Sequence, residues 1–318
     1  MPLPKKTRVG PYVIIEFLNS GGMADVYRAR VASRRQEVAL KISQLDRSEP
    51  ILNNALRFEV NLMSRLTHPG IVRVLPIPFK NRKQQPFMAR ALNLPGKPWY
   101  FAMEYLPGGS LETLTKKAGP LPFDLACAIG LEIAHALSYL HKNNIVHLDI
   151  KPDNILFRHT PQRDNPIAPV LTDFGIAAMN ATNASMRGGT TVIMPPELIR
   201  KMRGELPPEH DIDLRKVDVY MLGVVLYRMW TGKYPFDGLT RKRITSAIIR
   251  GRIISPRVYN DQVPPEAEEL IFDWLSRDPI MRPDLPEIRR YLTRWAGGLR
   301  RFPHTLTPTR RWPFGRKK

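Results

Sequence analysis

The chain has 318 residues, of which 43% are hydrophobic and 25% are charged, so a disordered or fibrous protein is excluded and one large domain or two small ones are allowed. A single cysteine, Cys127, excludes a disulfide scaffold and a cysteine-based zinc site. The formal net charge of +20 comes mainly from the first third of the chain and from the tail. Residues 1–103 carry 17 Lys/Arg against 6 Asp/Glu, and residues 296–318 carry 7 Lys/Arg and no Asp/Glu. That balance indicates nucleic acid, an anionic membrane, an acidic protein or simple solubility.

The first third of the chain is predicted to form strands and one helix. β-Branched, aromatic or alternating residues predict strands over residues 12–18, 26–31 and 37–42, and shorter ones over 71–76 and 99–104. Apolar residues at three- and four-residue spacing predict a helix over about 51–66. Residues 79–98, rich in Lys, Arg, Gln and Pro, are expected to form a long loop.

After residues 106–109, Leu-Pro-Gly-Gly, the apolar period becomes helical. Long core helices are expected over about 125–140 and 216–230, and shorter ones over 239–249, 266–275 and 286–295. The predicted fold class is α+β and bilobal, with a small antiparallel sheet lobe that carries one helix and a larger, mainly helical lobe. We divide the chain into a basic N-terminal extension, the small lobe, the hinge with the large lobe, and a basic tail, at residues 1–11, 12–103, 104–295 and 296–318.

Three short motifs carry the chemistry. His-Leu-Asp-Ile-Lys-Pro-Asp-Asn at 147–154 precedes Asp-Phe-Gly at 173–175 by about twenty residues, and Val-Ala-Leu-Lys at 38–41 lies on the third expected strand. In this order they resemble the protein kinases, and the bacterial eukaryotic-like Ser/Thr kinases in particular, from about residue 12 to 295. The resemblance implies a bilobal kinase fold and transfer of the γ-phosphate of ATP to Ser or Thr hydroxyls of protein substrates.

The resemblance also implies roles for individual side chains. Asp149 would accept the proton of the incoming hydroxyl, and Lys151 would neutralise the transferring phosphoryl group. Lys41 would hold the α- and β-phosphates, and Glu59 would pair with Lys41 and fix its ammonium.

Mg²⁺, or Mn²⁺ in its place, would be held by the oxygens of Asn154 and Asp173, since hard cations prefer such ligands. The nucleotide loop departs from the family pattern, because only the middle of its three glycines, Gly21, is kept. The remaining expected nucleotide contacts are apolar side chains, a flexible glycine and hinge backbone groups: Leu18, Gly22, Val26, Ala39, Met103, Glu104, Leu106 and Leu156.

Other positions are expected to be structural. Glu197 would form a buried pair with Arg282, and Asp218 would brace the backbone of the catalytic loop. Cys127 lies near the apolar face of a core helix, where a packed and inert thiol is expected.

Leu148 stands where most regulated kinases place the Arg that grips a phosphate on the activation loop. In the family, two further basic side chains help this Arg to bind the phosphate. The corresponding positions here are Ala178 and Ala55, whose side chains have no hydrogen-bond donor either. A phosphate at Thr182 or Ser185 would therefore have little to hold it. We expect catalysis without activation-loop phosphorylation.

The basic tail contains aromatic residues among its cations: Arg300, Arg301, Arg310, Arg311, Trp312, Phe314, Arg316, Lys317 and Lys318. It is expected either to contact an anionic membrane surface or to remain a solvated tail. No apolar run approaches the roughly 18 residues that span a bilayer, and we expect a cytoplasmic location with association to a membrane through this tail.

Three other classes of function are less well supported by the sequence. A pseudokinase scaffold is supported only by the altered glycine loop, since Lys41, Asp149, Asn154 and Asp173 are all present. A small-molecule phosphotransferase would not need the protein-docking segment at 189–197. A nucleic-acid-binding module explains only the charge, so no specific nucleic acid is expected.

Overall fold

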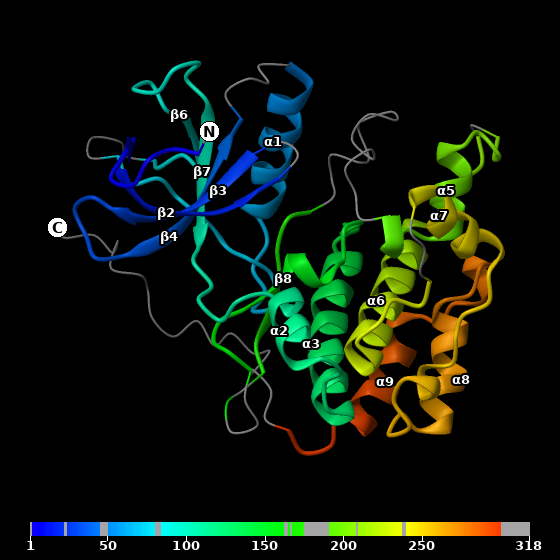
Figure 1. The fold of residues 1–318 in the computed structure, drawn as a ribbon. Helices are drawn as coiled ribbons and strands as arrows, with labels where there is room; N and C mark the ends of the chain where they lie inside the picture. Colours follow the sequence, from blue (N-terminus) through cyan, green and yellow to red (C-terminus); the bar gives the residue numbers. More distant parts are fainter. Residues whose placement is uncertain are drawn as a thin grey trace.

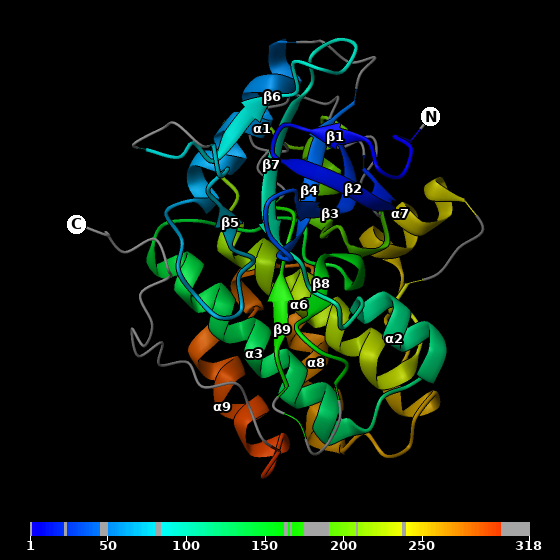
Figure 2. The ribbon, with the colours of Figure 1, turned by 90° about the vertical axis from the view of Figure 1, so that its left-hand side faces the viewer.

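Two lobes meet at the end of strand β7 in the computed structural model (Figure 1). The structure describes residues 2–21, 24–44, 50–79, 84–161, 165, 167–174, 191–207, 209–236 and 240–299, without the side chains of residues 50–55. The first lobe is a curled sheet that carries helix α1, and the second is built from helices (Figures 1 and 2).

The sheet of the first lobe has the strand order β1-β2-β3-β4-β7-β5, with β6 also paired to β7. Its pairs are antiparallel, and β4 lies in the centre with Ala39 opposite Met103 and Lys41 opposite Phe101. The strands are β1 Arg8–Val9, β2 Tyr12–Ser20, β3 Ala24–Val31, β4 Glu37–Ser43, β5 Val74–Leu75, β6 Met88–Arg90 and β7 Trp99–Glu104. The alternation along β3 buries Tyr27, Ala29 and Val31 on one face, as the sequence pattern predicts.

Two segments contribute more to this sheet than the sequence indicated. Arg8 and Val9, in the expected basic extension, pair with Val13 and Tyr12 as strand β1, and the Leu3 amide donates to the Tyr27 hydroxyl at 2.9 Å. The expected 79–98 loop contains β6, which pairs with β7. A two- or three-residue strand has no recognisable period, so only its partner reveals it.

Helix α1 (Pro50–Met63) lies against the sheet and buries Leu56, Val60 and Met63, which share one face at three- and four-residue spacing. On its outer side, the guanidinium carbon of Arg57 lies 5.7 Å from the ring centroid of Trp99 on β7. Burial of the apolar face fixes the orientation of the helix, and with it the direction of Glu59.

The helical lobe is organised around α3 (Phe123–Lys142) and α6 (Leu214–Thr231), which pack closely in its centre. A Cβ on Gly130 would lie 2.6 Å from the Leu226 side chain, so any larger residue there would require Leu226 to shift. Cys127 is fully buried there, as expected. The surrounding elements are α2 Leu111–Ala118, α5 Pro196–Met202, α7 Arg241–Arg250, η4 Pro256–Val258, α8 Pro265–Trp274, η5 Pro279–Met281 and α9 Leu285–Trp295.

Among the described residues, α3 alone is long and apolar enough to cross a membrane, by length and composition. In the structure, 67% of its most apolar window is buried inside the lobe. We therefore interpret α3 as a core helix, whose apolar residues are covered by α6 and α9.

A short turn and a hairpin lie between the two lobes. The turn η1 (Pro152–Asn154) leads into β8 (Ile155–Phe157), which pairs with β9 (Pro169–Leu171). Leu171 also bridges to Ile71 of the first lobe. The two motifs around residues 147–154 and 173 are thus placed at the ends of one small hairpin, facing the sheet.

Candidate active site

Three side chains from three separate elements meet at the base of the sheet. The Lys41 Nζ of β4 lies 2.9 Å from Glu59 Oε1 of α1 and 2.7 Å from Asp173 Oδ1, which follows β9. Lys41 and Glu59 are buried, whereas 41% of the Asp173 side chain is exposed. The expected Lys41–Glu59 pair is present, and α1 therefore sits where its carboxylate can hold the ammonium in place.

The electrostatics of this cluster favour the charged forms of Lys41 and Asp173, whereas burial raises the pKa of Glu59 above its ordinary value. Burial by itself lowers the pKa of Lys41, but the carboxylates of Asp173 and Glu59 outweigh it and the pKa lies above its ordinary value. Burial raises the pKa of Asp173, but the Lys41 ammonium outweighs it and the pKa lies below the ordinary value. A cation and an anion are thus both fixed where the sheet meets the residues after β9.

A second cluster forms on the catalytic loop. Asp149 Oδ2 lies 2.7 Å from Lys151 Nζ and also accepts a hydrogen bond from Asn154 Nδ2 at 2.7 Å. The same Asn154 nitrogen donates to the Asp149 backbone carbonyl at 2.9 Å, which fixes the amide orientation. These contacts set the direction of the Asp149 carboxylate, of which 27% of the side chain is exposed.

The two clusters are joined through Asn154 and the residues after β9. The Thr172 amide donates to the Asn154 carbonyl at 2.9 Å, and Asn154 Nδ2 lies 3.5 Å from the Asp173 carbonyl. Asp173 has a φ of 55°, in the left-handed region. These contacts bring together the four catalytic and metal candidates, Asp149, Lys151, Asn154 and Asp173, and join them to the Lys41–Glu59 pair.

The buried Asp218 carboxylate fixes the backbone of the catalytic loop by hydrogen bonds. Asp218 of α6 accepts hydrogen bonds from the amides of His147 at 2.9 Å and Leu148 at 2.8 Å, and lies 2.8 Å from His141 Nε2. The His147 ring stacks on Phe174 with centroids 4.8 Å apart, and burial lowers the pKa of His147. This geometry agrees with the expected bracing by Asp218.

The expected apolar adenine contacts, Leu18 excepted, belong to the hydrophobic core that continues through both lobes. Ala39, Met103 and Leu106 are buried in one apolar cluster, and Val26 and Leu156 pack against it from the two lobes. Leu18 lies on β2 and is 40% exposed, outside this cluster. In the nucleotide loop, the Gly21 amide donates to the Ala24 carbonyl at 2.9 Å, and Gly22 lies outside the described residues.

Glu104 and Leu106 were expected to contribute backbone groups to a purine. The Glu104 amide already donates to the Arg73 carbonyl at 3.0 Å, so this amide is not available to a ligand. The Glu104 carboxylate, which the sequence analysis did not consider, pairs with Arg158 at 2.5 Å. Arg158 also donates to the Pro69 carbonyl at 2.9 Å. Glu104, Arg158 and Pro69 are far apart in sequence, so no local sequence pattern predicted that Arg158 would link the other two.

The oxygens of Asn154 and Asp173 suit a hard divalent cation. Asn154 uses its amide nitrogen for its hydrogen bonds, which leaves Oδ1, and Asp173 uses Oδ1 toward Lys41, which leaves Oδ2. Mg²⁺ takes few protein ligands when substrate phosphates complete its shell. Within the described residues, no group of three or more His, Cys, Asp or Glu side chains forms a metal site of its own.

The expected buried pair of the helical lobe is present. Arg282 places Nη1 2.7 Å from Glu197 Oε1 and Nη2 2.8 Å from Glu197 Oε2, and both residues are buried. Arg282 Nε and Nη1 also donate to the carbonyls of Ser276 and Lys216. The pair therefore ties α5 to the start of α6 and to the segment before α9.

Residues 12–292 match the model of the protein kinase domain, and the chain belongs to this family. It is 31% identical over 283 residues to the serine/threonine-protein kinase PrkC of Bacillus subtilis, with 87% of this chain and 39% of the relative covered. It is 32% identical over 288 residues to the DNA damage-responsive serine/threonine-protein kinase RqkA of Deinococcus radiodurans, with 89% and 39% covered.

A solved structure is similar as well. The crystal structure of Rad53 1–466 in complex with AMP-PNP matches with a TM-score of 0.67 and 26% identity, over 90% of this chain and 65% of that one. The expected family and bilobal fold are thus confirmed. The chain spans only 36–39% of the length of the curated relatives PrkC, RqkA and a probable serine/threonine-protein kinase of Clostridium perfringens.

Several expectations fall on residues that the structure does not describe. Ala178, Thr182 and Ser185 lie in the undescribed segment 175–190, the side chain of Ala55 is not described, and the tail from Arg300 onward lies outside the described residues. Predictions about these positions rest on the sequence alone.

Proposed function

We propose that this chain is an ATP-dependent Ser/Thr protein kinase that transfers the γ-phosphate of ATP to protein hydroxyls. The observation that carries the proposal is the convergence of Lys41, Asp173, Asn154 and Asp149 around one space between the lobes. Membership of the protein kinase domain family and the Ser/Thr kinases among its relatives support it. The AMP-PNP named for the Rad53 structure supports ATP as the nucleotide.

In this mechanism the chain supplies positioning and charge, which is most of what phosphoryl transfer requires. Bound Mg²⁺, or Mn²⁺, would neutralise phosphate charge, and Asn154 and Asp173 would hold it. Lys41, fixed by Glu59, orients the phosphates. Lys151, 2.7 Å from Asp149, is placed to neutralise charge on the transferred group.

Asp149 is the proton acceptor for the substrate hydroxyl in this proposal. Its carboxylate is oriented by Asn154 and Lys151, while 27% of its side chain faces solvent. A positioned base of this kind contributes roughly 10²–10⁴-fold to a rate. The adenine would lie against Val26, Ala39, Met103 and Leu156, with the backbone of the hinge beside it.

The test is transfer of labelled phosphate from Mg²⁺·ATP by the purified chain to itself and to a generic protein substrate, followed by phosphoamino-acid analysis. Phosphoserine or phosphothreonine supports the proposal, and absence of any transfer with intact nucleotide binding supports the pseudokinase alternative. A magnesium-dependent thermal shift with ATP measures that binding. Phosphotyrosine as the main product would contradict the Ser/Thr assignment.

We further propose that the non-Arg catalytic loop makes activity independent of activation-loop phosphorylation. Leu148 packs partly buried against the apolar core and has no hydrogen-bond donor in its side chain. If a phosphate on the activation loop paired instead with an exposed basic side chain, that ion pair would contribute at most about 1 kcal/mol. Shifting the protein almost completely from an inactive to an active conformation needs about 5.5 kcal/mol. Kinase activity would therefore be controlled by a ligand, a partner or the location of the protein.

The location itself is proposed to be cytoplasmic, with contact to an anionic membrane through the basic tail. Each Lys or Arg near anionic lipid contributes about 1 kcal/mol, and Trp312 and Phe314 suit the interface. Co-sedimentation with anionic and neutral vesicles at low and high salt tests this. No binding to anionic vesicles at low salt would show that the tail is only solvated.

A further inference from the structure

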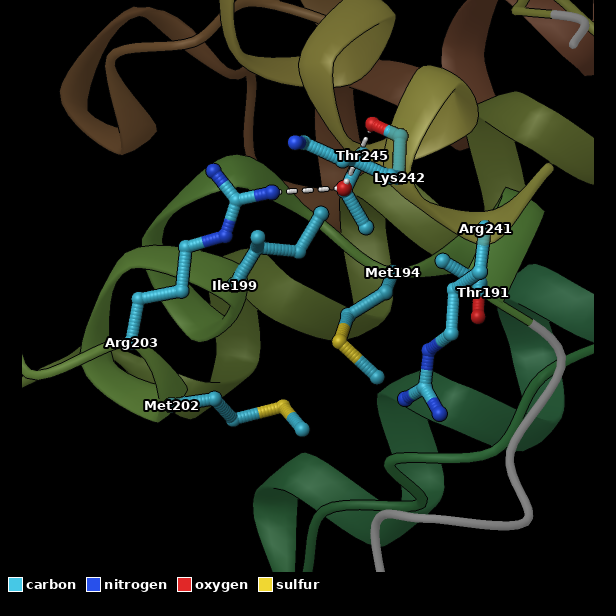
Figure 3. Close-up of a pocket in the computed structure, with 8 residues that line it drawn as sticks. All are labelled: Thr191, Met194, Ile199, Met202, Arg203, Arg241, Lys242 and Thr245. Atoms are coloured by element: carbon cyan, nitrogen blue, oxygen red, sulfur yellow. Dashed lines mark hydrogen bonds between the residues drawn. The ribbon is translucent and has the colours of Figure 1, made fainter.

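A pocket of about 430 Å³ lies in the helical lobe, away from the clusters described above (Figure 3). It opens between the turn η3 (Thr191–Ile193), helix α5 and helix α7. This volume is near the lower end of the roughly 300–1,000 Å³ of small-ligand pockets, so it suits one or two side chains. Its lining residues are Thr191, Met194, Ile199, Met202, Arg203, Arg241, Lys242 and Thr245.

The inner part of the pocket is apolar. Met194 is 8% exposed and Ile199 is 3% exposed, and Met202 of α5 is half-buried beside them. Methionine is flexible and polarisable, so a wall with two of them adapts to more than one apolar partner. This part of the pocket can therefore accept apolar side chains of different shapes.

The rim of the pocket is cationic. Arg203 comes from the end of α5, and Arg241 and Lys242 come from the first turn of α7, where all three are exposed. Arg203 Nη2 donates to Thr245 Oγ1 at 2.6 Å, and the same hydroxyl donates to the Lys242 carbonyl at 3.0 Å (Figure 3). These bonds hold the Arg203 guanidinium against the α7 wall, so its orientation is set before a ligand arrives.

Arg203 Nη1 of the rim lies 3.5 Å from an acidic side chain, Glu205. Both side chains of that pair are exposed, at 39% and 45%, so the pair is weak and open to exchange. No Asp or Glu is among the residues that line the pocket. An anion entering it would meet cations without a competing carboxylate in the wall.

Helix α7 and the residues after it carry charge of one sign, positive, unlike residues 204–213 after Arg203, which contain four Asp/Glu and no Lys/Arg. Residues 240–260 contain six Lys/Arg and no Asp/Glu, whereas α8, Pro265–Trp274, contains four Asp/Glu and no Lys/Arg. The sequence therefore gives the α7 side of the lobe a positive field that attracts acidic ligands.

We propose that this pocket selects protein substrates by receiving an acidic side chain, Asp or Glu, that lies next to an apolar side chain. The proposal rests on the proposed kinase activity, and it is favoured by place, because η3 belongs to the segment 189–197 that resembles the substrate-docking loop of the family. The carboxylate would meet Lys242 and Arg203, and the apolar neighbour would lie on Met194 and Ile199.

The experiment uses the full chain and a set of Ser/Thr peptides in which each position around the acceptor carries Glu, Gln or Lys. The wild-type protein is expected to show at least tenfold higher kcat/KM for Glu than for Gln at one position. Lys242→Glu should abolish that preference or turn it toward Lys. Arg243→Glu is the matched control, because Arg243 is exposed on the same turn and does not line the pocket.

The outcomes separate this inference from the proposed function. Equal kcat/KM for Glu and Gln peptides at every position, with transfer intact, would overturn the inference alone. The same holds if Arg243→Glu changes the preference as much as Lys242→Glu does. Absence of transfer to every peptide, together with absence of autophosphorylation, contradicts the kinase proposal instead. Circular dichroism and thermal unfolding of both variants establish that they are folded.

Discussion

The Leu148 amide donates to Asp218 Oδ1 at 2.8 Å while Leu148 itself has a φ of 63°, in the left-handed region. A branched side chain seldom adopts this backbone, and such positions cost roughly 1–3 kcal/mol each. Asp218 offsets that cost by accepting from two successive amides, since His147 also donates to it. The bent backbone directs Asp149 toward Lys151 and Asn154 instead of toward the core.

Asp218→Asn should therefore weaken the catalytic loop. An amide offers one oxygen acceptor in place of two, so one buried N–H loses its partner at a cost of about 1–3 kcal/mol. We expect the free energy of unfolding to fall by that amount and kcat to fall more than KM rises. Denaturant unfolding and steady-state kinetics measure the two effects. Asp273→Asn, on the exposed side of α8, is the control and should stay within about 0.5 kcal/mol of the wild type.

Lys41→Met and Asp149→Asn should each lower the rate of phosphate transfer by roughly 10²–10⁴-fold, because a positioning cation or a positioned base is lost. Single-turnover transfer from labelled ATP measures this. Lys116→Met, on the exposed face of α2 where Lys116 pairs with Glu112, is a matched control that should keep full activity. Unchanged transfer by either variant would contradict the assigned roles.

The buried Glu197–Arg282 pair should be costly to break from one side. Arg282→Met leaves the Glu197 carboxylate buried without its partner, which typically costs about 3–5 kcal/mol. The double variant, with Glu197→Leu added, removes that unpaired charge and should recover a part of the loss. Chemical denaturation of the single and double variants tests this. A double variant less stable than Arg282→Met would show that the pair is not what the stability depends on.

Stability should fall on mild acidification, partly because of His147. Burial lowers the pKa of His147 below its ordinary 6.5, so the unfolded chain takes up this proton at a higher pH than the folded chain does. The free energy of unfolding should decrease as the pH drops below about 6.5, by at most about 1.4 kcal/mol per pH unit for this one group.

His147→Phe keeps a ring to stack on Phe174 and removes the titration, so its profile from pH 7 to pH 5 should be flatter than that of the wild type. Absolute stability is not the readout, because the Asp149 amide loses its contact with His147 Nδ1. Replacing the exposed His210 by Gln should leave the wild-type slope. Parallel profiles for wild type and His147→Phe would contradict the prediction.

The sequence predicted most of the elements whose signal lies in one long segment. Helices α3 and α6 were found because their apolar period runs over many residues, and β7 was found from its aromatic and apolar run. Strands β1 and β6 were missed because each is defined by its partner across the sheet. The motif order supplied the candidate catalytic residues, but the contact of Lys41 with Asp173 spans 132 positions and only the fold reveals it.

The cationic pocket was missed for a different reason. Its signal, the run Arg241-Lys242-Arg243 in a nearly neutral lobe, is present in the sequence. Without the fold, however, that run could equally be a solvated helix face. The contact between Arg203 and Thr245, 42 positions apart, brings the end of α5 against α7, so that the basic run lines a pocket.

The last prediction concerns regulation by the activation loop. Leu148 has no donor for a phosphate, and the helper positions of the family are Ala178 and Ala55. Replacing Thr182 and Ser185 together by Ala should therefore leave transfer to a generic protein substrate within about threefold of the wild type, since an exposed ion pair contributes at most about 1 kcal/mol.

Thr190 stays unchanged in this test, because its family counterpart contacts the catalytic Asp and Lys directly. Thr293→Ala together with Ser138→Ala, on helices α9 and α3 of the helical lobe, provides a control with the same two types of change. A loss of tenfold or more in the Thr182/Ser185 variant, about 1.4 kcal/mol in the barrier, that Glu at either position restores would show that a phosphate there does order the loop. Arg187 would then be the first basic residue to replace, since it is the only Lys or Arg between residues 175 and 190.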